Sequence, residues 1–256
     1  MSNVIKYPVP EKILEEIQNG DLLVHYLEKE GVEYVFGIPG GALEPIYNAL
    51  AKAELRGGLR PILTKHEQGA AFMADGYSRV SGTLGVCCAT TGPGATNLFA
   101  GITTSYADSI PVLALTAQIP IRNFGKSAFQ DSSHEGIDVV EIFKKSTTYS
   151  AMVINSSLAD DMFRKAIRMA LSGKRGPVHL SLPSDVMAEK IDEDAVSHSM
   201  SSSYSQTLHF DRNSIKEAVK LISRAKKVAM LVGSGALWSG AAPEVRDLAE
   251  LLTMPT

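Results

Sequence analysis

Two stretches of this 256-residue sequence combine residue types that could bind or activate a small molecule. In Gly37-Ile38-Pro39-Gly40-Gly41, the glycines permit positive φ and let a ligand approach the bare backbone. In the second stretch, Glu67 follows His66 where a helix is expected to begin. Each stretch also has a structural interpretation, because turns favour glycine and proline and helix starts favour acids.

Two further stretches are rich in polar or turn-forming residues. The segment 90–97, TTGPGATN, precedes an expected helix, and backbone amides at a helix start can hold an anion. It lacks the lysine and the spacing of a nucleotide-binding P-loop. The segment 125–131, GKSAFQD, is polar with one aromatic residue, Phe129. Taken singly, none of the four stretches identifies a function.

The elements that position these stretches are short apolar runs that alternate with helix-length segments. The runs are too short for helices and lack polar alternation, which is typical of strands buried on both faces of a parallel sheet. They are Val35-Phe36, Pro61–Leu63, Leu84–Ala89, Pro111–Leu115 and Pro177–Leu182. Helices are expected between most of them, at 43–53, 67–80, 95–106 and 156–171. The pattern predicts an α/β fold with a parallel sheet flanked by helices.

Changes in composition divide the chain into four parts. Residues 1–18 form an N-terminal extension, and residues 19–190 form the α/β domain, whose first helix we expect Asn19 to cap. Residues 191–208 are acidic and then serine-rich, which indicates a linker. Residues 209–256 begin a second α/β domain with helices at 211–223 and 242–252 and a strand at 228–232. A single strand cannot close a sheet, so this domain is expected to be incomplete within the sequence.

Overall composition excludes several classes of protein. Hydrophobic residues make up 45%, charged residues 21%, and the mean hydropathy is +0.02, as in ordinary globular proteins. A net charge of −3 argues against nucleic acid as a partner. No apolar run is long enough for a membrane span. The first 20 residues do not resemble a signal peptide, and the adjacent Cys87 and Cys88 fit a buried strand in a reducing compartment, so we expect a cytoplasmic protein.

Taken together and in order, the motifs resemble the pyrimidine-binding domain of thiamine-diphosphate-dependent enzymes. The similarity is greatest to the acetolactate synthase and pyruvate oxidase group. It extends over roughly residues 19 to 190, and residues from 209 onward resemble the start of that family's central domain. The motifs that carry it are GIPGG (37–41), KHEQGAAFMADGYSR (65–79), TTGPGATN (90–97), AFQD (128–131) and GPVHLSLPSDV (176–186).

The resemblance implies a role for each candidate residue. Glu67 would be the catalytic acid, hydrogen-bonding N1′ of the cofactor's aminopyrimidine and so promoting loss of the thiazolium C2 proton. The residues that would bind the cofactor are Pro39, Glu67, Gly92, Pro93 and Asn97. Those that would face a 2-keto acid such as pyruvate are Gly40, Phe129 and Gln130. The resemblance also implies a homo-oligomer, a dimer or tetramer.

No metal ligand is predicted in this sequence. The family's Mg²⁺ and diphosphate site contains a Gly-Asp-Gly motif, which does not occur in these 256 residues. We therefore expect the Mg²⁺ ligands to lie outside this chain, and the chain alone to be inactive. FAD is a further cofactor that the resemblance allows, held by the central domain.

Several alternatives stay open. Biosynthetic acetolactate synthases usually carry lysine where this chain has Ser184, so a related oxidase, decarboxylase or acetyltransferase is an alternative assignment. A non-catalytic partner subunit is another, although such a subunit would have no use for Glu67. A nucleotide-binding protein of Rossmann type is a third, because Gly233-Ser234-Gly235 and Gly240 loosely match its glycine pattern.

Overall fold

The computed structural model describes residues 17–191 and 210–253. The chain divides into two compact units, residues 1–206 and 207–256, which are described separately below. None of the helices within the described ranges is both long and apolar enough to cross a lipid bilayer.

The first unit contains a six-stranded sheet in the order β2-β1-β3-β4-β6-β5, and every pairing in it is parallel. The strands are β1 (Tyr34–Gly37), β2 (Arg60–Leu63), β3 (Gly85–Ala89), β4 (Val112–Gln118), β5 (Tyr149–Met152) and β6 (Val178–Pro183). Every residue of β3, β4 and β6 is buried. The predicted α/β class with a parallel sheet is confirmed.

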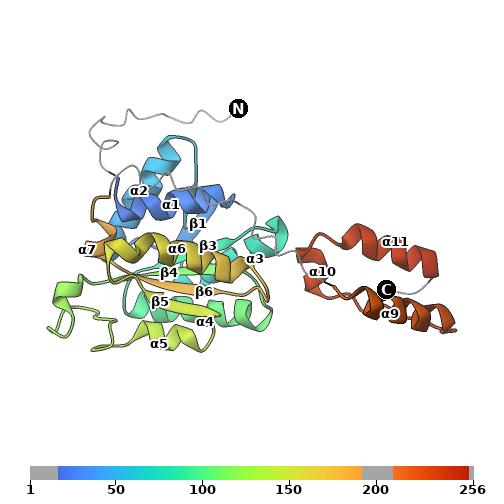
Figure 1. Cartoon of the computed structure of the whole chain (residues 1–256). Helices are drawn as coiled ribbons and strands as arrows, with labels where there is room; N and C mark the ends of the chain where they lie inside the picture. The colour runs from blue at the N-terminus through green and yellow to red at the C-terminus, as the bar shows by residue number, and fades with distance from the viewer. Residues whose placement is uncertain (1–16, 192–209, 254–256) are drawn as a thin grey trace. The chain divides into compact units, whose positions relative to one another are not determined.

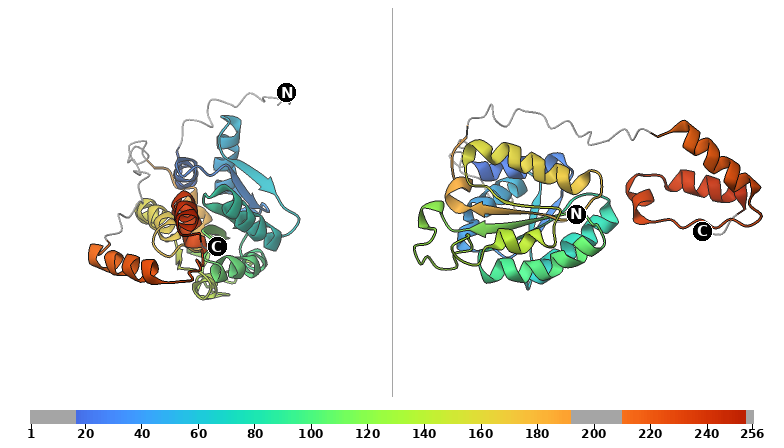
Figure 2. Two further views of the ribbon diagram at one scale, coloured as in Figure 1. Left: turned by 90° about the vertical axis from the view of Figure 1, so that its right-hand side faces the viewer. Right: turned by 60° about the horizontal axis from the view of Figure 1, so that its bottom comes forward.

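Helices cover both faces of this sheet (Figure 1). One layer contains the mutually packed helices α1 (Asn19–Lys29), α2 (Glu44–Leu55), α6 (Ser156–Leu171) and α7 (Ser184–Met187). The other layer contains α3 (Glu67–Ser81), α4 (Pro93–Ala107) and α5 (Val139–Lys144). Figure 2 shows the same two layers from other directions. Two short 3-10 turns, η2 (Gly41–Leu43) and η3 (Ile121–Asn123), follow β1 and β4.

The predicted strands of this unit have ends within three residues of the observed ones, but the edge strand β5 was not predicted. Its four residues, Tyr149–Met152, are all only partly buried and include no continuous apolar run. An edge strand gains its backbone hydrogen bonds from one neighbour, here β6, and this pairing cannot be seen in the local pattern.

The predicted capping role of Asn19 is wrong. Gln18 is the N-cap of α1, and Asn19 is the first helical residue and is fully buried. Its side-chain amide donates to Ser156 Oγ (2.7 Å) and to the Val186 carbonyl (2.8 Å). These long-range partners explain why a residue of good capping type lies inside the helix.

The second unit contains only helices within residues 210–253: α9 (Arg212–Arg224), α10 (Ser234–Trp238) and α11 (Ala242–Leu252). The predicted helices are confirmed, but the predicted strand at 228–232 is absent from this part of the structure. A strand needs a neighbour for its backbone groups, and these residues include no other strand to provide one. Leu231 is consequently 100% exposed.

A buried histidine lies on β6, between β4 and the edge strand β5. His179 is 0% exposed, and its ring stacks on Phe143 with centroids 3.9 Å apart. Its Nε2 is 2.8 Å from Thr116 Oγ1, and its Nδ1 is 2.8 Å from Ser150 Oγ. Burial lowers the pKa of His179 from 6.5 to about 3.

This environment predicts a loss of stability in acid. Below pH 6.5 the unfolded chain binds a proton at His179 that the folded chain does not. The contribution of His179 to the free energy of unfolding therefore falls by about 1.4 kcal/mol for each pH unit between 6.5 and 3. Urea unfolding at pH 7 and pH 5 should show that the His179→Gln variant loses less stability between these pH values than the wild type.

A matched control is available in His134, whose side chain is 71% exposed. The His134→Gln variant makes the same substitution at an exposed site and so controls for the loss of a histidine as such. An equal pH dependence in wild type and His179→Gln would show that folding does not lower the pKa of His179.

Candidate functional site

The segments singled out from the sequence follow consecutive strands and lie at one edge of the sheet. Residues 37–41 follow β1, α3 begins after β2, residues 90–97 follow β3, and residues 119–138 follow β4. All these strands are parallel, so their carboxyl ends lie at the same edge. This edge is where open α/β sheets bind ligands.

Glu67 is the first residue of α3, and His66 is its N-cap. The His66 Nδ1 accepts a hydrogen bond from the Gln68 backbone N–H (3.2 Å), so His66 and not Glu67 caps this helix. Glu67 is half-buried, and its Oε2 accepts a hydrogen bond from Asn97 Nδ2 (3.1 Å). Among the described residues, Glu67 Oε1 has no hydrogen-bond partner.

Thr90 joins two of the glycine segments to each other. A Cβ atom built on Gly40 would lie 2.5 Å from Thr90 Oγ1, and one built on Gly94 would lie 2.8 Å from Thr90 Cγ2. The Cβ atom built on Gly94 would also lie 3.4 Å from Glu67 Oε1. No side chain fits at either glycine without displacing its neighbours, so the two loops pack closely beside Glu67.

The segment after β4 is joined to the segment after β3. Gly92 has a φ of 63°, and a Cβ atom built there would lie 3.0 Å from Gln130 Cβ. Thr91 Oγ1 is 2.7 Å from the Gln130 carbonyl oxygen. Phe129 is 85% exposed at the rim, and Pro39 and Pro93 are exposed as well.

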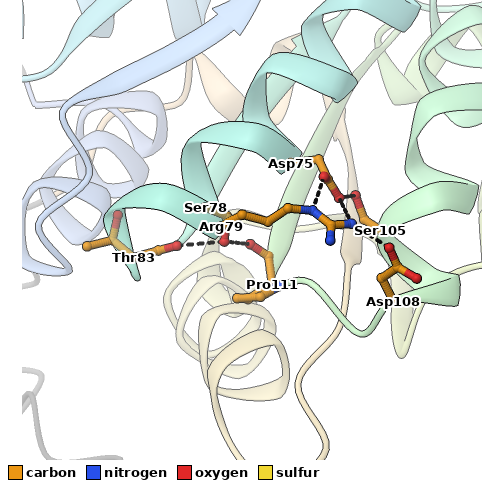
Figure 3. Close-up of polar contacts among 7 residues, drawn as sticks. All are labelled: Asp75, Ser78, Arg79, Thr83, Ser105, Asp108 and Pro111. Atoms are coloured by element: carbon orange, nitrogen blue, oxygen red, sulfur yellow. Dashed lines mark hydrogen bonds and ion pairs between the residues drawn. The ribbon is translucent and has the colours of Figure 1, made fainter. Parts of the chain in front are cut away.

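A partly buried polar cluster joins α3 to α4 (Figure 3). Asp75 is 6% exposed and accepts hydrogen bonds from Arg79 Nε (2.6 Å) and Ser105 Oγ (2.8 Å). Arg79 also pairs with Asp108 at 2.7 Å. Hydrogen bonds to Asp75 and then to Asp108 raise the pKa of Arg79. The cluster joins the C-terminal halves of the two helices, while the Asn97–Glu67 bond joins their N-terminal parts.

Close packing of small residues also holds α3 against α4. A Cβ atom on Gly101 would lie 2.5 Å from Ala71 Cβ and 3.0 Å from the Gln68 carbonyl. Ala70, Ala74 and Ala95 are each 0% exposed within the chain. Small residues of α3 and α4 therefore pack against each other within the chain.

Roles were assigned from the sequence to residues at this edge of the sheet. None was assigned to most of the residues whose hydrogen bonds connect the segments there. Thr91 was quoted only as part of a motif, and Asp75, Ser105 and Ser132 were given no role. Ser132 and Ser105 are 0% exposed. Ser105 Oγ bonds to Asp75, which is 30 positions away, and Ser132 Oγ contacts Thr91 and Gly92, which are 41 and 40 positions away. Only these distant partners distinguish the two hydroxyls from those of ordinary serines.

Two family models match the chain. The model described as "Thiamine pyrophosphate enzyme, N-terminal TPP binding domain" matches residues 17–141. The model described as "Thiamine pyrophosphate enzyme, central domain" matches residues 215–256. The first match includes all the segments described above, and the second covers most of the second unit.

Curated relatives agree with these models. The chain is 41% identical over 244 residues to a probable acetolactate synthase large subunit of Methanococcus aeolicus, covering 93% of this chain and 39% of that protein. It is 38% identical to an acetolactate synthase of Arthrospira platensis (96% and 42% coverage). It is 36% identical to the acetolactate synthase isozyme 3 large subunit of Escherichia coli strain K12 (94% and 41%). The chain thus spans about two fifths of the length of these relatives.

Proposed function

Since the chain belongs to the thiamine pyrophosphate enzyme family, we propose that it forms the pyrimidine-binding half of an acetolactate-synthase-like enzyme. This enzyme would decarboxylate pyruvate or a similar 2-keto acid and form a new carbon–carbon bond. The observation that carries the proposal is Glu67, a half-buried carboxylate at a helix start with one oxygen held by Asn97. A purely structural acid would not need an oxygen left without a partner.

The residues at this edge fit the aminopyrimidine ring of thiamine diphosphate. Glu67 Oε1 is available to hold a proton shared with a ring nitrogen, while the Asn97 amide fixes the other oxygen. The exposed rings of Pro39 and Pro93 would provide apolar surface. Gly92, also assigned to the cofactor site, is buried, and its backbone N–H donates to Ser132 Oγ (2.7 Å). When bound, the cofactor supplies the electron sink for cleavage of the bond between the carboxyl group and the keto carbon.

The chain's own residues then have distinct tasks. Glu67 holds and returns a proton at its carboxylate, and Asn97 orients that carboxylate. We assign contact with the keto acid to Gly40, Phe129 and Gln130. These residues follow β1 and β4, the two neighbours of β3, and the segment after β3 (residues 90–97) is called the ring-binding loop below.

Mg²⁺ would anchor the diphosphate and is assigned to residues outside this chain. The described residues contain no group of three or more His, Cys, Asp or Glu side chains placed to hold a metal ion. FAD would belong to the central domain. The model of this domain matches residues 215–256 of the chain. We further propose a cytoplasmic location.

Product analysis tests this function against its alternatives. An active enzyme that contains this chain should convert pyruvate to carbon dioxide and acetolactate. Acetaldehyde, acetyl phosphate or hydrogen peroxide as the main product would instead assign it to a related decarboxylase or oxidase. Absence of turnover together with tight association with an active subunit would indicate a non-catalytic partner. The Rossmann alternative is weakened, because no strand precedes Gly233 in the described residues of the second unit.

We also propose a homo-oligomer, dimer or tetramer, formed through the outer face of α3. Apolar side chains remain exposed on this helix: Phe72 is 45%, Met73 42% and Val80 91% exposed. Exposed apolar side chains that adjoin one another indicate an interaction surface.

Sedimentation velocity should detect this association in an enzyme that contains the chain. The Phe72→Glu variant should shift the protein toward monomer, since a buried charge is costly at an interface. Leu158→Glu on α6 is the control, because Leu158 is also 45% exposed but lies in the other helix layer. A stable, active monomer of the wild type would contradict the proposal.

A further inference from the structure

We propose that Thr91 and Ser132 are positioning residues that hold the rim loop, residues 119–138, in the conformation in which it presents Phe129 and Gln130. The inference rests on the proposed function in one respect, the assignment of Phe129 and Gln130 to contact with the keto acid. The positioning itself rests on contacts among the described residues.

Two buried hydroxyl groups join the rim loop to the loop after β3. Thr91 is 3% exposed and Ser132 is 0% exposed. Thr91 Oγ1 is 2.7 Å from both the Gln130 carbonyl oxygen and Ser132 Oγ. Ser132 Oγ in turn accepts a hydrogen bond from the Gly92 backbone N–H (2.7 Å). The hydroxyl pair thus contacts both the ring-binding loop and the backbone next to Phe129.

The end of β4 completes this network. Gln118 is 0% exposed, and its Oε1 accepts hydrogen bonds from the Ile119 N–H (2.9 Å) and the Ser132 N–H (3.2 Å). Ser132 is therefore held through its backbone by one strand end and through its side chain by the next. A buried residue with this many partners has a single well-defined position.

The network holds a backbone conformation that needs support. Gln130 has a φ of 59°, in the left-handed region that is uncommon for residues other than glycine. Its carbonyl oxygen is the atom that Thr91 Oγ1 and Ser132 Oγ (3.2 Å) approach. These bonds therefore act on the peptide unit that has to stay in the unfavourable conformation.

Phe129 depends on this support. Its side chain is 85% exposed, so packing against the protein does little to fix its position. The direction in which it points is set by the backbone of residues 128–132. Glu67 and Asn97 hydrogen-bond each other and share no bond with this network. Loss of the hydroxyl pair should therefore disturb substrate contact while leaving the proton-holding group in place.

The test compares Thr91→Val with wild type in an active enzyme that contains this chain. Valine keeps the shape of threonine and removes only the hydroxyl. We expect the KM for pyruvate to rise about tenfold, the equivalent of one lost hydrogen bond, with kcat less affected. Thr91→Ser should restore the wild-type KM. If Thr91→Val fails to fold, Ser132→Ala tests the same contacts.

The matched control is Thr147→Val. Thr147 is 6% exposed and donates one hydrogen bond to the Phe143 carbonyl (2.7 Å), before the start of β5 at the opposite edge of the sheet. This variant loses a comparable buried hydrogen bond and should keep the wild-type KM. Equal KM increases in both variants would overturn the positioning role, because they would report general destabilisation.

A second measurement is independent of the substrate. Backbone amide hydrogen exchange of residues 119–138, without ligand, should be faster in Thr91→Val by about tenfold and unchanged in Thr147→Val. Unchanged exchange and unchanged KM in Thr91→Val would overturn the proposal. Faster exchange in a protein whose wild type does not act on 2-keto acids would support the positioning role and refute the proposed function.

Discussion

Replacing Glu67 with glutamine in an active enzyme that contains this chain is expected to lower kcat by about 10²- to 10⁴-fold and to leave the fold intact. The proposed role of Glu67 is to hold and return a proton at its carboxylate. An amide of nearly the same shape can keep a hydrogen bond but cannot exchange that proton.

The contacts of Glu67 explain why the fold should survive. Its side chain is half-buried, and its Oε2 accepts one hydrogen bond, from Asn97. Helix α3 is capped by His66 and held to α4 by the Asp75 cluster, so neither feature needs the Glu67 charge. Circular dichroism and urea unfolding of Glu67→Gln should match those of wild type.

Glu44→Gln is the matched control for the change of charge. Glu44 is also the first residue of a helix, α2, and it is exposed. Both variants remove one negative charge from a helix start, so any effect of the helix dipole should be similar in the two. Near-normal kcat in Glu67→Gln, or an equal loss in Glu44→Gln, would remove the basis for assigning cofactor activation to Glu67.

The second large effect concerns the 256-residue chain tested by itself, which is expected to show no turnover of pyruvate and only weak binding of thiamine diphosphate. The residues assembled at the sheet edge can contact the aminopyrimidine ring. The sequence contains no Gly-Asp-Gly motif, and the described residues include no cluster that could hold the metal beside the diphosphate. The ring contacts alone must overcome several kcal/mol of lost translational and rotational freedom.

Isothermal titration calorimetry with Mg²⁺ present measures this directly. We expect a dissociation constant weaker than about 1 mM for the chain alone. Adding a chain that carries a diphosphate-binding domain of the same family should tighten binding and produce turnover. Micromolar binding with turnover by the isolated chain would contradict this prediction, because it would show that the chain also binds the diphosphate.

Aspects of this protein that depend on neighbouring residues along the chain could be determined from the sequence. Helix α6 was predicted with its observed bounds, Ser156–Leu171, because its apolar residues repeat at helical spacing. The run of apolar residues at 84–89 predicted β3, which is buried throughout. The motif residues also had to share one edge, because consecutive parallel strands place their carboxyl ends together.

Only the tertiary structure decided which residues contact each other at that edge. It paired Asn97 with Glu67, assigned the helix cap to His66, and brought Thr91 and Ser132 together across 41 positions. It also left residues 228–232 without a strand to pair with, although their sequence favours one. Hydrogen-bond partners far apart in the chain depend on strand order and helix packing. A local pattern of residue types carries no information on either, because both are set by which surfaces bury each other.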